Sequence, residues 1–240
     1  MINLLVANKF SALMPPAPPI PARSDQPLTQ AERAARAADS MMEAAIELLN
    51  TVGIQGTTLV AIGEKSGYSR GLVTHHFGSK AGLFRAVLKR ITAAWTADLV
   101  RNLKGETGLR AITAAIGAHL EHVLRHPDYI RAQNILWGAA LDPSSEFKPN
   151  VAEFMRIQRE SVADWVRGGQ ENGEILPEIN PKRIAEQYYG GLIGINSQWL
   201  VSPDFDLRAA YEDFEHNLVR LLSAPKHARD TDTLNREERQ

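Results

Sequence analysis

Apolar residues recur at spacings of three and four along almost the whole chain between residues 29 and 223. This period places them on one face of an α-helix, whereas a half-buried strand would show alternation at every second residue. Strand-type alternation bounded by hairpin turns is not found, and the chain has no internal repeat. The sequence therefore predicts an all-α fold.

Glycine, proline and capping residues divide the periodic sequence into about nine helices. Thr58, Ser69 and Ser79 are placed to accept hydrogen bonds at helix N-termini. Pro143 and Pro149 are expected in a loop. The helices are expected at about residues 29–53, 58–65, 69–77, 80–103, 109–126, 128–140, 151–173, 181–202 and 206–223.

Composition is that of a globular protein. Of the 240 residues, 44% are hydrophobic and 23% are charged, and the formal net charge of −1 does not indicate a polyanionic partner. The absence of cysteine excludes disulfides, zinc–thiolate sites and thiol nucleophiles, and it suits a reducing cytoplasm, where we expect the protein to be located. No apolar run is long enough to span a membrane, so no membrane association is expected.

Residues 57–80, TTLVAIGEKSGYSRGLVTHHFGSK, are the most informative stretch. Two short helices joined by Ser66-Gly67-Tyr68-Ser69 predict a helix-turn-helix. Gly67 lies in the turn, where a positive φ would strain a residue with a side chain. Gly63 lies where the two helices are expected to cross closely. The residues placed to pack the helices together are Ile62, Tyr68, Val73 and Phe77.

Positive charge gathers around this segment although the protein as a whole is nearly neutral. The second helix presents an outward face without a carboxylate, formed by Arg70, Gly71, Thr74 and His75. Between positions 66 and 90 there are five basic residues and no acidic residue. Such a patch suits phosphate contacts, because each neutralised phosphate releases counterions. The pattern predicts DNA binding.

The segment resembles the DNA-binding domain of the TetR family of transcriptional regulators. In that family the recognition helix ends in a Tyr-His-Phe-like run followed by Lys and Leu, and the matching run here is VTHHFGSKAGLF at residues 73–84. The resemblance covers residues 31–88, and beyond them it depends on helix number and length. The sequence departs from the family at Thr74, where an aromatic residue is frequent, and at Gly78, where a polar or basic residue is common.

The resemblance implies a regulator, more often a repressor, that binds a palindromic operator in double-stranded DNA as a homodimer and is released by a small-molecule effector. Arg70 is the best candidate for reading a guanine. The last two helices, at 181–202 and 206–223, would form the dimer interface, and the glycines at 190, 191 and 194 indicate close helix approach or a kink. The residues expected to contact DNA are Thr58, Tyr68, Ser69, Arg70, Thr74, His75, His76 and Lys80.

These expectations divide the chain into four parts. They are a disordered proline-rich extension (1–28), a helix-turn-helix DNA-binding domain (29–88), a helical effector-binding and dimerisation domain (89–223) and a polar tail (224–240). Aromatic residues of the middle helices are candidates for an effector pocket, since such pockets have apolar walls and few polar groups. Core packing is the alternative for each of them. The expected lining residues are Trp95, His119, Trp137, Phe154, Gln158 and Trp165.

The histidines raise the question of a metal. His75 and His76 are adjacent on a helix and point about 100° apart, so one ion cannot easily bind both. His119, His122 and His126 are spaced i, i+3, i+7, which can suit a transition metal. Helical-wheel arithmetic places them at the flank of an apolar face, so a solvated rim is expected. No metal site and no cofactor are therefore predicted.

Two other functions stay open. One is an all-α ligand-binding or partner-docking protein with a degenerate helix-turn-helix. The other is an α-helical enzyme, for which Glu121 near His119 and His122 is the only faint candidate. No nucleophile–base spacing and no phosphate-binding glycine loop is found, so the protein is not expected to be an enzyme.

Overall fold

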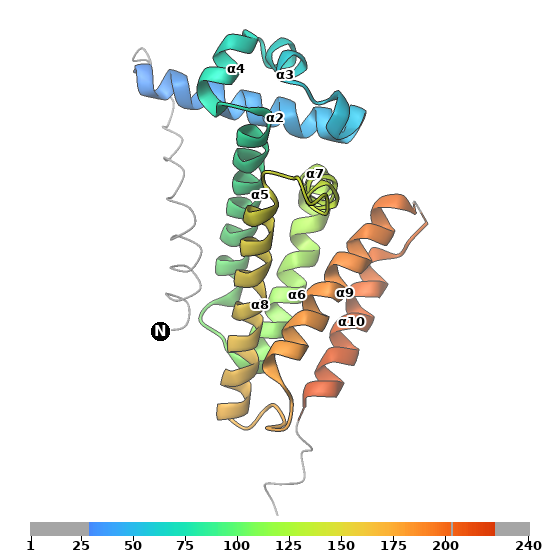
Figure 1. The fold of residues 1–240 in the computed structure, drawn as a ribbon. Helices are drawn as coiled ribbons and strands as arrows, with labels where there is room; N and C mark the ends of the chain where they lie inside the picture. The colour runs from blue at the N-terminus through green and yellow to red at the C-terminus, as the bar shows by residue number, and fades with distance from the viewer. Residues whose placement is uncertain (1–28, 203, 224–240) are drawn as a thin grey trace, which may run out of the picture.

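The computed structural model describes residues 29–202 and 204–223, which form nine helices (Figure 1). Within these ranges the only strand-like pairing is a single bridge between Ile175 and Ser223. The expected extension at 1–28 and tail at 224–240 lie outside the described residues. The helices are α2 (Gln30–Gly56), α3 (Leu59–Ser66), α4 (Arg70–Phe77), α5 (Lys80–Leu103), α6 (Gly108–Arg125), α7 (Pro127–Ala139), α8 (Lys148–Glu171), α9 (Pro181–Val201) and α10 (Leu207–Leu222).

The N-terminal helices begin at the capping residues that the sequence predicts. At α2, Thr29 and Glu32 form a capping box, in which each side chain bonds the other residue's backbone N–H. The hydroxyls of Thr58, Ser69 and Ser79 accept hydrogen bonds from backbone amides three residues on, at 3.1, 3.2 and 3.0 Å. These bonds satisfy amides that have no partner inside the helix.

Figure 1 shows α2, α3 and α4 gathered at one end of the molecule, with α5 running from them into a bundle with α6 and α8. The axis of α7 is seen end-on beneath α2, which it contacts. The helices α9 and α10 lie side by side along one flank of the bundle. No helix of the described ranges is long and apolar enough to cross a membrane.

Two hydrophobic cores share α5. Phe84 and Ile91 of α5 pack with residues of α2, α3, α4, α7 and the start of α8. Leu99 and Leu103, farther along α5, pack with residues of α6, α8, α9 and α10. The boundary expected between positions 88 and 89 therefore falls inside one continuous helix, which connects the two cores.

Two helix limits differ from the expected ones. Gly53, expected to end the first helix, has a φ of 70° and a ψ of −176°, so it makes a kink after which the chain winds on to Gly56. Pro149, expected in a loop, lies in the first turn of α8, where a missing N–H costs nothing because no helical acceptor precedes it.

Candidate DNA interface and interior cavity

The turn between α3 and α4 is closed by two glycines. Gly67 ends α3 in the left-handed conformation, with a φ of 79°. A Cβ atom on Gly63 would lie 2.7 Å from the carbonyl oxygen of Tyr68 and 3.1 Å from the amide nitrogen of Arg70. Because both contacts are to backbone, no side-chain movement could relieve them. This confirms that α3 and α4 cross at Gly63.

Helix α4 places four predicted residues on the outside of the protein. Arg70, Gly71, Thr74 and His75 are exposed, whereas His76 is partly buried. The Thr74 hydroxyl donates a 3.0 Å hydrogen bond to the Arg70 carbonyl oxygen. Arg70 has no ion pair within residues 29–202 and 204–223, so its guanidinium is free to bind a partner.

The predicted residues Tyr68 and Lys80, beside α4, make more contacts within the protein than the exposed residues of α4 do. Tyr68 is partly buried and packs against the N-terminal core. The Lys80 ammonium donates a 2.6 Å hydrogen bond to the carbonyl oxygen of Ile54 and lies 5.5 Å from the centre of the Phe84 ring. Burial lowers the pKa of Lys80 below its usual value. Lys80 therefore joins the end of α2 to the start of α5, with two of its N–H groups left for other acceptors.

The five basic residues between positions 66 and 90 do not all serve one surface. Arg90 turns towards α2, where its nitrogens lie 2.8 Å from Asp39 Oδ1 and 2.7 Å from Glu43 Oε1. Arg90 Nε also donates to the Tyr129 hydroxyl at 3.2 Å, and that hydroxyl donates to Glu43 at 2.8 Å. This network ties α2, α5 and α7 together and neutralises the Arg90 charge.

All six residues expected to line a pocket meet around one interior cavity between α5, α6, α7, α8 and α9. They are joined there by residues that the sequence prediction missed, including Asn134, Tyr188 and Asn196. The cavity is small, about 40 Å³ measured as the space open to the centre of a water-sized sphere. The predicted residues at its wall are Trp95, His119, Trp137, Phe154, Gln158 and Trp165.

A second cavity, of about 230 Å³ by the same measure, adjoins the first on the side of the DNA-binding helices. The two share four lining residues, Thr92, Gln133, Trp137 and Phe154. The second cavity is also lined by two basic residues of α5, Arg85 and Lys89. The four shared residues therefore lie at the boundary between a small inner chamber and a larger outer one.

The expected solvated rim of histidines is wrong for His119 and His122. The His122 side chain is only 1% exposed, and its ring packs near the Trp95 ring, 5.6 Å between centres. His119 Nδ1 lies 2.6 Å from the Tyr211 hydroxyl of α10, and that hydroxyl donates to Asn196 Oδ1 at 2.9 Å. Partners on α5 and α10 cover this face of α6, and the helical wheel of α6 alone cannot show them.

Asp98 of α5 is the buried partner of His122. Its Oδ2 lies 2.8 Å from His122 Nδ1, and its Oδ1 accepts from Arg101 at 2.9 Å and from Arg125 at 3.1 Å. Burial raises the pKa of Asp98, but the hydrogen bond with His122 and the charges of the two arginines outweigh it and hold that pKa below its usual value. Asp98 is therefore ionised and can only accept, so His122 Nδ1 carries the proton.

Burial also keeps the two cavity histidines neutral. Burial is the main cause that lowers the pKa of His119 to about 3, and a positive charge on His122 would act in the same direction. Burial lowers the pKa of His122 as well, and the bond to Asp98 opposes that shift without reversing it. The inner cavity is consequently lined by neutral polar groups and aromatic rings.

Three side chains of the inner cavity have a buried polar atom without a hydrogen-bond partner. These atoms are Nε2 of His122, Nε2 of Gln158 and Nε1 of Trp165. Buried polar groups are usually paired, and an unpaired one costs about 1–3 kcal/mol. The cavity wall thus offers two unused donors, on Gln158 and Trp165, and one unused acceptor, on His122.

The three glycines of α9 have different surroundings. A Cβ atom on Gly191 would lie 2.4 Å from the Phe214 ring of α10, so this glycine allows the two helices to approach closely. A Cβ atom on Gly190 or Gly194 would meet nothing within 4 Å. No residue of α9 departs from helical backbone angles, so close approach explains Gly191 and a kink explains none of them.

Comparisons with known proteins agree with this architecture. The family described as "Bacterial regulatory proteins, tetR family" matches residues 41–87, which span most of α2 and all of the helix-turn-helix. The HTH-type transcriptional regulator BetI of Burkholderia ambifaria is 31% identical over 191 residues, which cover 77% of this chain and 92% of BetI. BetI of Burkholderia thailandensis is 22% identical over 192 residues, covering 78% and 93% of the two chains.

Solved structures share the fold. A putative TetR-family transcriptional regulator from Rhodococcus sp. superposes with a TM-score of 0.70 at 19% identity, covering 79% of this chain and all of that one. NalD, the secondary repressor of the MexAB-OprM multidrug efflux pump in Pseudomonas aeruginosa, gives a TM-score of 0.66 at 21% identity, with 83% of this chain and all of NalD covered. The relatives are transcriptional regulators and not enzymes. The chain therefore belongs to the TetR family of bacterial regulatory proteins and is a DNA-binding transcriptional regulator.

Proposed function

We propose that the protein is a homodimeric repressor that binds a palindromic operator through α4 and leaves it when a small molecule occupies the interior cavity. The observation that carries this proposal is the continuity of α5. Its first residue, Lys80, follows the recognition helix, and Thr92 and Trp95 on the same helix line the cavity. A displacement of α5 by a ligand would therefore move the recognition helix.

In the proposed complex, the exposed face of α4 enters the major groove. Arg70 makes no ion pair with a described residue and is assigned the bidentate contact to a guanine, while Tyr68, Thr74 and His75 face neighbouring bases. The hydroxyl hydrogen of Thr74 is occupied by the Arg70 carbonyl, which leaves the Thr74 methyl for a thymine. The residues assigned to backbone phosphates are Thr58, Ser69, His76 and Lys80.

The proposed dimer interface consists of α9 and α10. Along α9 a line of exposed or partly buried residues recurs every three or four positions, and it includes Gly190, Gly194 and Val201, of which Val201 is 79% exposed. On α10, Leu221 is 54% exposed. Small residues at the centre of such a line allow another helix to approach closely. A dimer would place two recognition helices about 34 Å apart, or a multiple of that, to match one palindrome.

The proposed effector is uncharged or weakly charged, with an aromatic or apolar body and hydrogen-bonding groups. The neutral, aromatic wall and the unpaired atoms of Gln158, Trp165 and His122 support this assignment. A ligand can shift DNA binding only through a difference in its affinity for the two protein arrangements. The repressor role is supported by NalD, whose fold is similar and which is described as a repressor.

The test is binding to the DNA that flanks the protein's own gene, followed by fluorescence anisotropy across a salt series with a scrambled duplex as competitor. Tight, sequence-selective binding with a log–log salt slope of several units is expected. Sedimentation of the same complex should give two chains per duplex. Compounds that release the duplex would then identify the effector class.

Other outcomes would overturn parts of the proposal. A complex with one chain per duplex would contradict the proposed dimer. An effector that tightens DNA binding would mean that the effector recruits the protein to DNA and does not release it. Loss of all binding at low salt would favour the ligand-binding alternative with a degenerate helix-turn-helix, and turnover of generic ester or phosphate substrates would favour the enzyme.

A further inference from the structure

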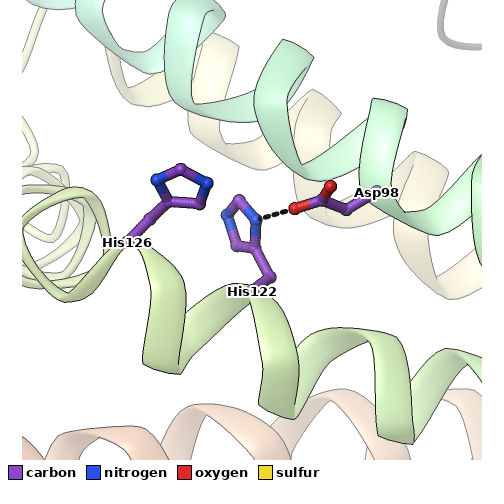
Figure 2. A group of neighbouring side chains, drawn as sticks. All are labelled: Asp98, His122 and His126. Atoms are coloured by element: carbon purple, nitrogen blue, oxygen red, sulfur yellow. Dashed lines mark hydrogen bonds and ion pairs between the residues drawn. The ribbon is translucent and has the colours of Figure 1, made fainter.

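Beside the inner cavity, three side chains of types that bind metals come together. Asp98 lies in α5, His122 lies in α6, and His126 is the residue that ends α6. One ligand atom from each of Asp98, His122 and His126 lies within 4.8 Å of the other two. Figure 2 shows the His126 ring on the side of His122 that faces away from Asp98. The rings of the two histidines lie 5.0 Å apart, centre to centre.

The sequence spacing of the two histidines suits a shared ion. His122 lies in the last turn of α6 and His126 is the residue that ends it, four positions later. Histidines at i and i+4 lie on one face of a helix, which is the spacing of helical zinc ligands. Of the three histidines spaced along this helix, only His122 and His126 remain as candidate ligands, because His119 is hydrogen-bonded to Tyr211.

His122 is prepared as a ligand by Asp98. The carboxylate accepts the Nδ1–H bond at 2.8 Å, which leaves the lone pair on Nε2. That Nε2 atom is buried and has no hydrogen-bond partner. A carboxylate that holds the far nitrogen of a histidine is the usual outer partner of a metal-bound imidazole, since it fixes the tautomer and raises the basicity of the ligand.

His126 is the second histidine of the pair. It is partly buried, stacks on Tyr129 at 5.4 Å, and its ring makes no hydrogen bond to any described residue. Two nitrogens bound to one ion at about 2.0–2.1 Å must lie about 3.3 Å apart. The ligand atoms of the cluster lie within 4.8 Å of one another, so the His126 ring would have to move closer to His122, and it makes no hydrogen bond to a described residue that would oppose this movement.

The charges around the cluster are balanced. Arg101 bonds Oδ1 of Asp98, Arg125 bonds both carboxylate oxygens at 3.1 Å, and the side chains of the two arginines are 65% and 49% exposed. Glu121 lies 3.8 Å from Arg125 and offsets one of the two positive charges. An incoming dication therefore meets one buried carboxylate and two imidazole rings, and solvent screens the exposed parts of the arginines.

We propose that His122 and His126 bind a divalent transition-metal ion, of the class of Zn²⁺, Ni²⁺ or Co²⁺, with Asp98 as the positioning carboxylate behind His122. Imidazole nitrogens favour these ions over Mg²⁺ and Ca²⁺, which take oxygen ligands. The remaining coordination positions face water or a molecule in the adjoining cavity. The site does not depend on the proposed dimer or operator, and a metal ion would occupy the His122 Nε2 lone pair that is otherwise open to the proposed effector.

The experiment is titration of the full, tag-free and chelator-treated chain with Co²⁺, followed by visible absorption, and with Zn²⁺, followed by calorimetry. We expect one ion per chain. The His126→Asn variant should bind at least tenfold more weakly, and Asp98→Asn should lose about 10–100-fold in affinity, as loss of an outer partner does. The absence of DNA from the assay keeps its result separate from the test of operator binding.

Two controls test three of the other histidines. His216→Asn changes an exposed histidine of α10, and the double variant His75→Asn/His76→Asn removes the adjacent pair on α4; both should bind as the parent does. Zn²⁺ should raise the thermal midpoint of the parent and not that of His126→Asn, which shows that the variant is folded and has lost the site. Stoichiometric binding that survives in His126→Asn, or no binding by the parent, would overturn the proposal.

Discussion

The helix-turn-helix and the interior cavity differ in whether their buried polar groups have hydrogen-bond partners. Between residues 58 and 80 each helix start is capped by a hydroxyl, and no buried side-chain nitrogen or oxygen of that segment lacks a partner. Around the cavity, buried atoms of His122, Gln158 and Trp165 are unpaired. A surface that recognises its partner from outside can be internally complete, whereas a surface that admits a ligand keeps groups for that ligand to satisfy.

The largest expected effect tests the packing of the helix-turn-helix, where α3 and α4 cross at Gly63. The change Gly63→Val should lower the free energy of unfolding by about 3 kcal/mol, because the new side chain would strike the backbone of Tyr68 and Arg70. Urea unfolding measures it. The matched control is Gly117→Val, on an exposed position of α6 with open space around it, where a change within about 0.5 kcal/mol is expected. Equal midpoints for the two variants would mean that the helices do not cross closely at Gly63.

The next effect concerns base recognition by the exposed face of α4. The change Arg70→Ala should cost about 2 kcal/mol of operator affinity and relax selectivity at one base pair per half-site. Anisotropy with single-base operator variants measures both. Lys80→Ala is the comparison, since loss of a phosphate contact should weaken all sequences alike and lower the salt slope by about one unit. An unchanged operator affinity in Arg70→Ala would remove that residue from base reading.

The cavity should respond in the opposite sense to loss of a polar group. Gln158→Leu removes an unpaired buried amide nitrogen and should raise the free energy of unfolding by about 1 kcal/mol. Asn134→Leu is the matched variant, because Asn134 donates to the Ile130 carbonyl at 2.9 Å and accepts from Ser197 at 3.2 Å. It should lower the same quantity by about 1 kcal/mol. Destabilisation of both variants to the same extent would show that Gln158 is satisfied in solution.

The smallest effect concerns the link between the two regions. Tyr129→Phe removes the hydroxyl that bridges Arg90 and Glu43, but leaves their direct ion pair in place. We expect a loss of about 0.5 kcal/mol in unfolding free energy, within the range of exposed pairs. Tyr189→Phe, whose hydroxyl makes no hydrogen bond to a described residue, should show no loss. A larger loss in Tyr189→Phe than in Tyr129→Phe would contradict the bridging role.

The helix starts and the helix-turn-helix were predictable from sequence because their causes are local. A capping hydroxyl, a left-handed glycine and a glycine at a crossing act within a few residues, and Thr58, Gly67 and Gly63 have the predicted geometry. The histidine prediction failed because its causes are distant. Asp98 is 24 positions from His122, and Tyr211 is 92 positions from His119. The six predicted cavity residues meet, while the contacts assigned to DNA, effector and dimer stay predictions.

The small size of the inner chamber has a consequence for timing. About 40 Å³ holds only a few water molecules, so a larger effector of the proposed kind would fit the inner chamber only after its walls moved apart. If that widened arrangement is sparsely populated without the effector, both the apparent affinity and the association rate fall in proportion to its population. The regulator would respond to a lasting rise in effector concentration and ignore a brief one.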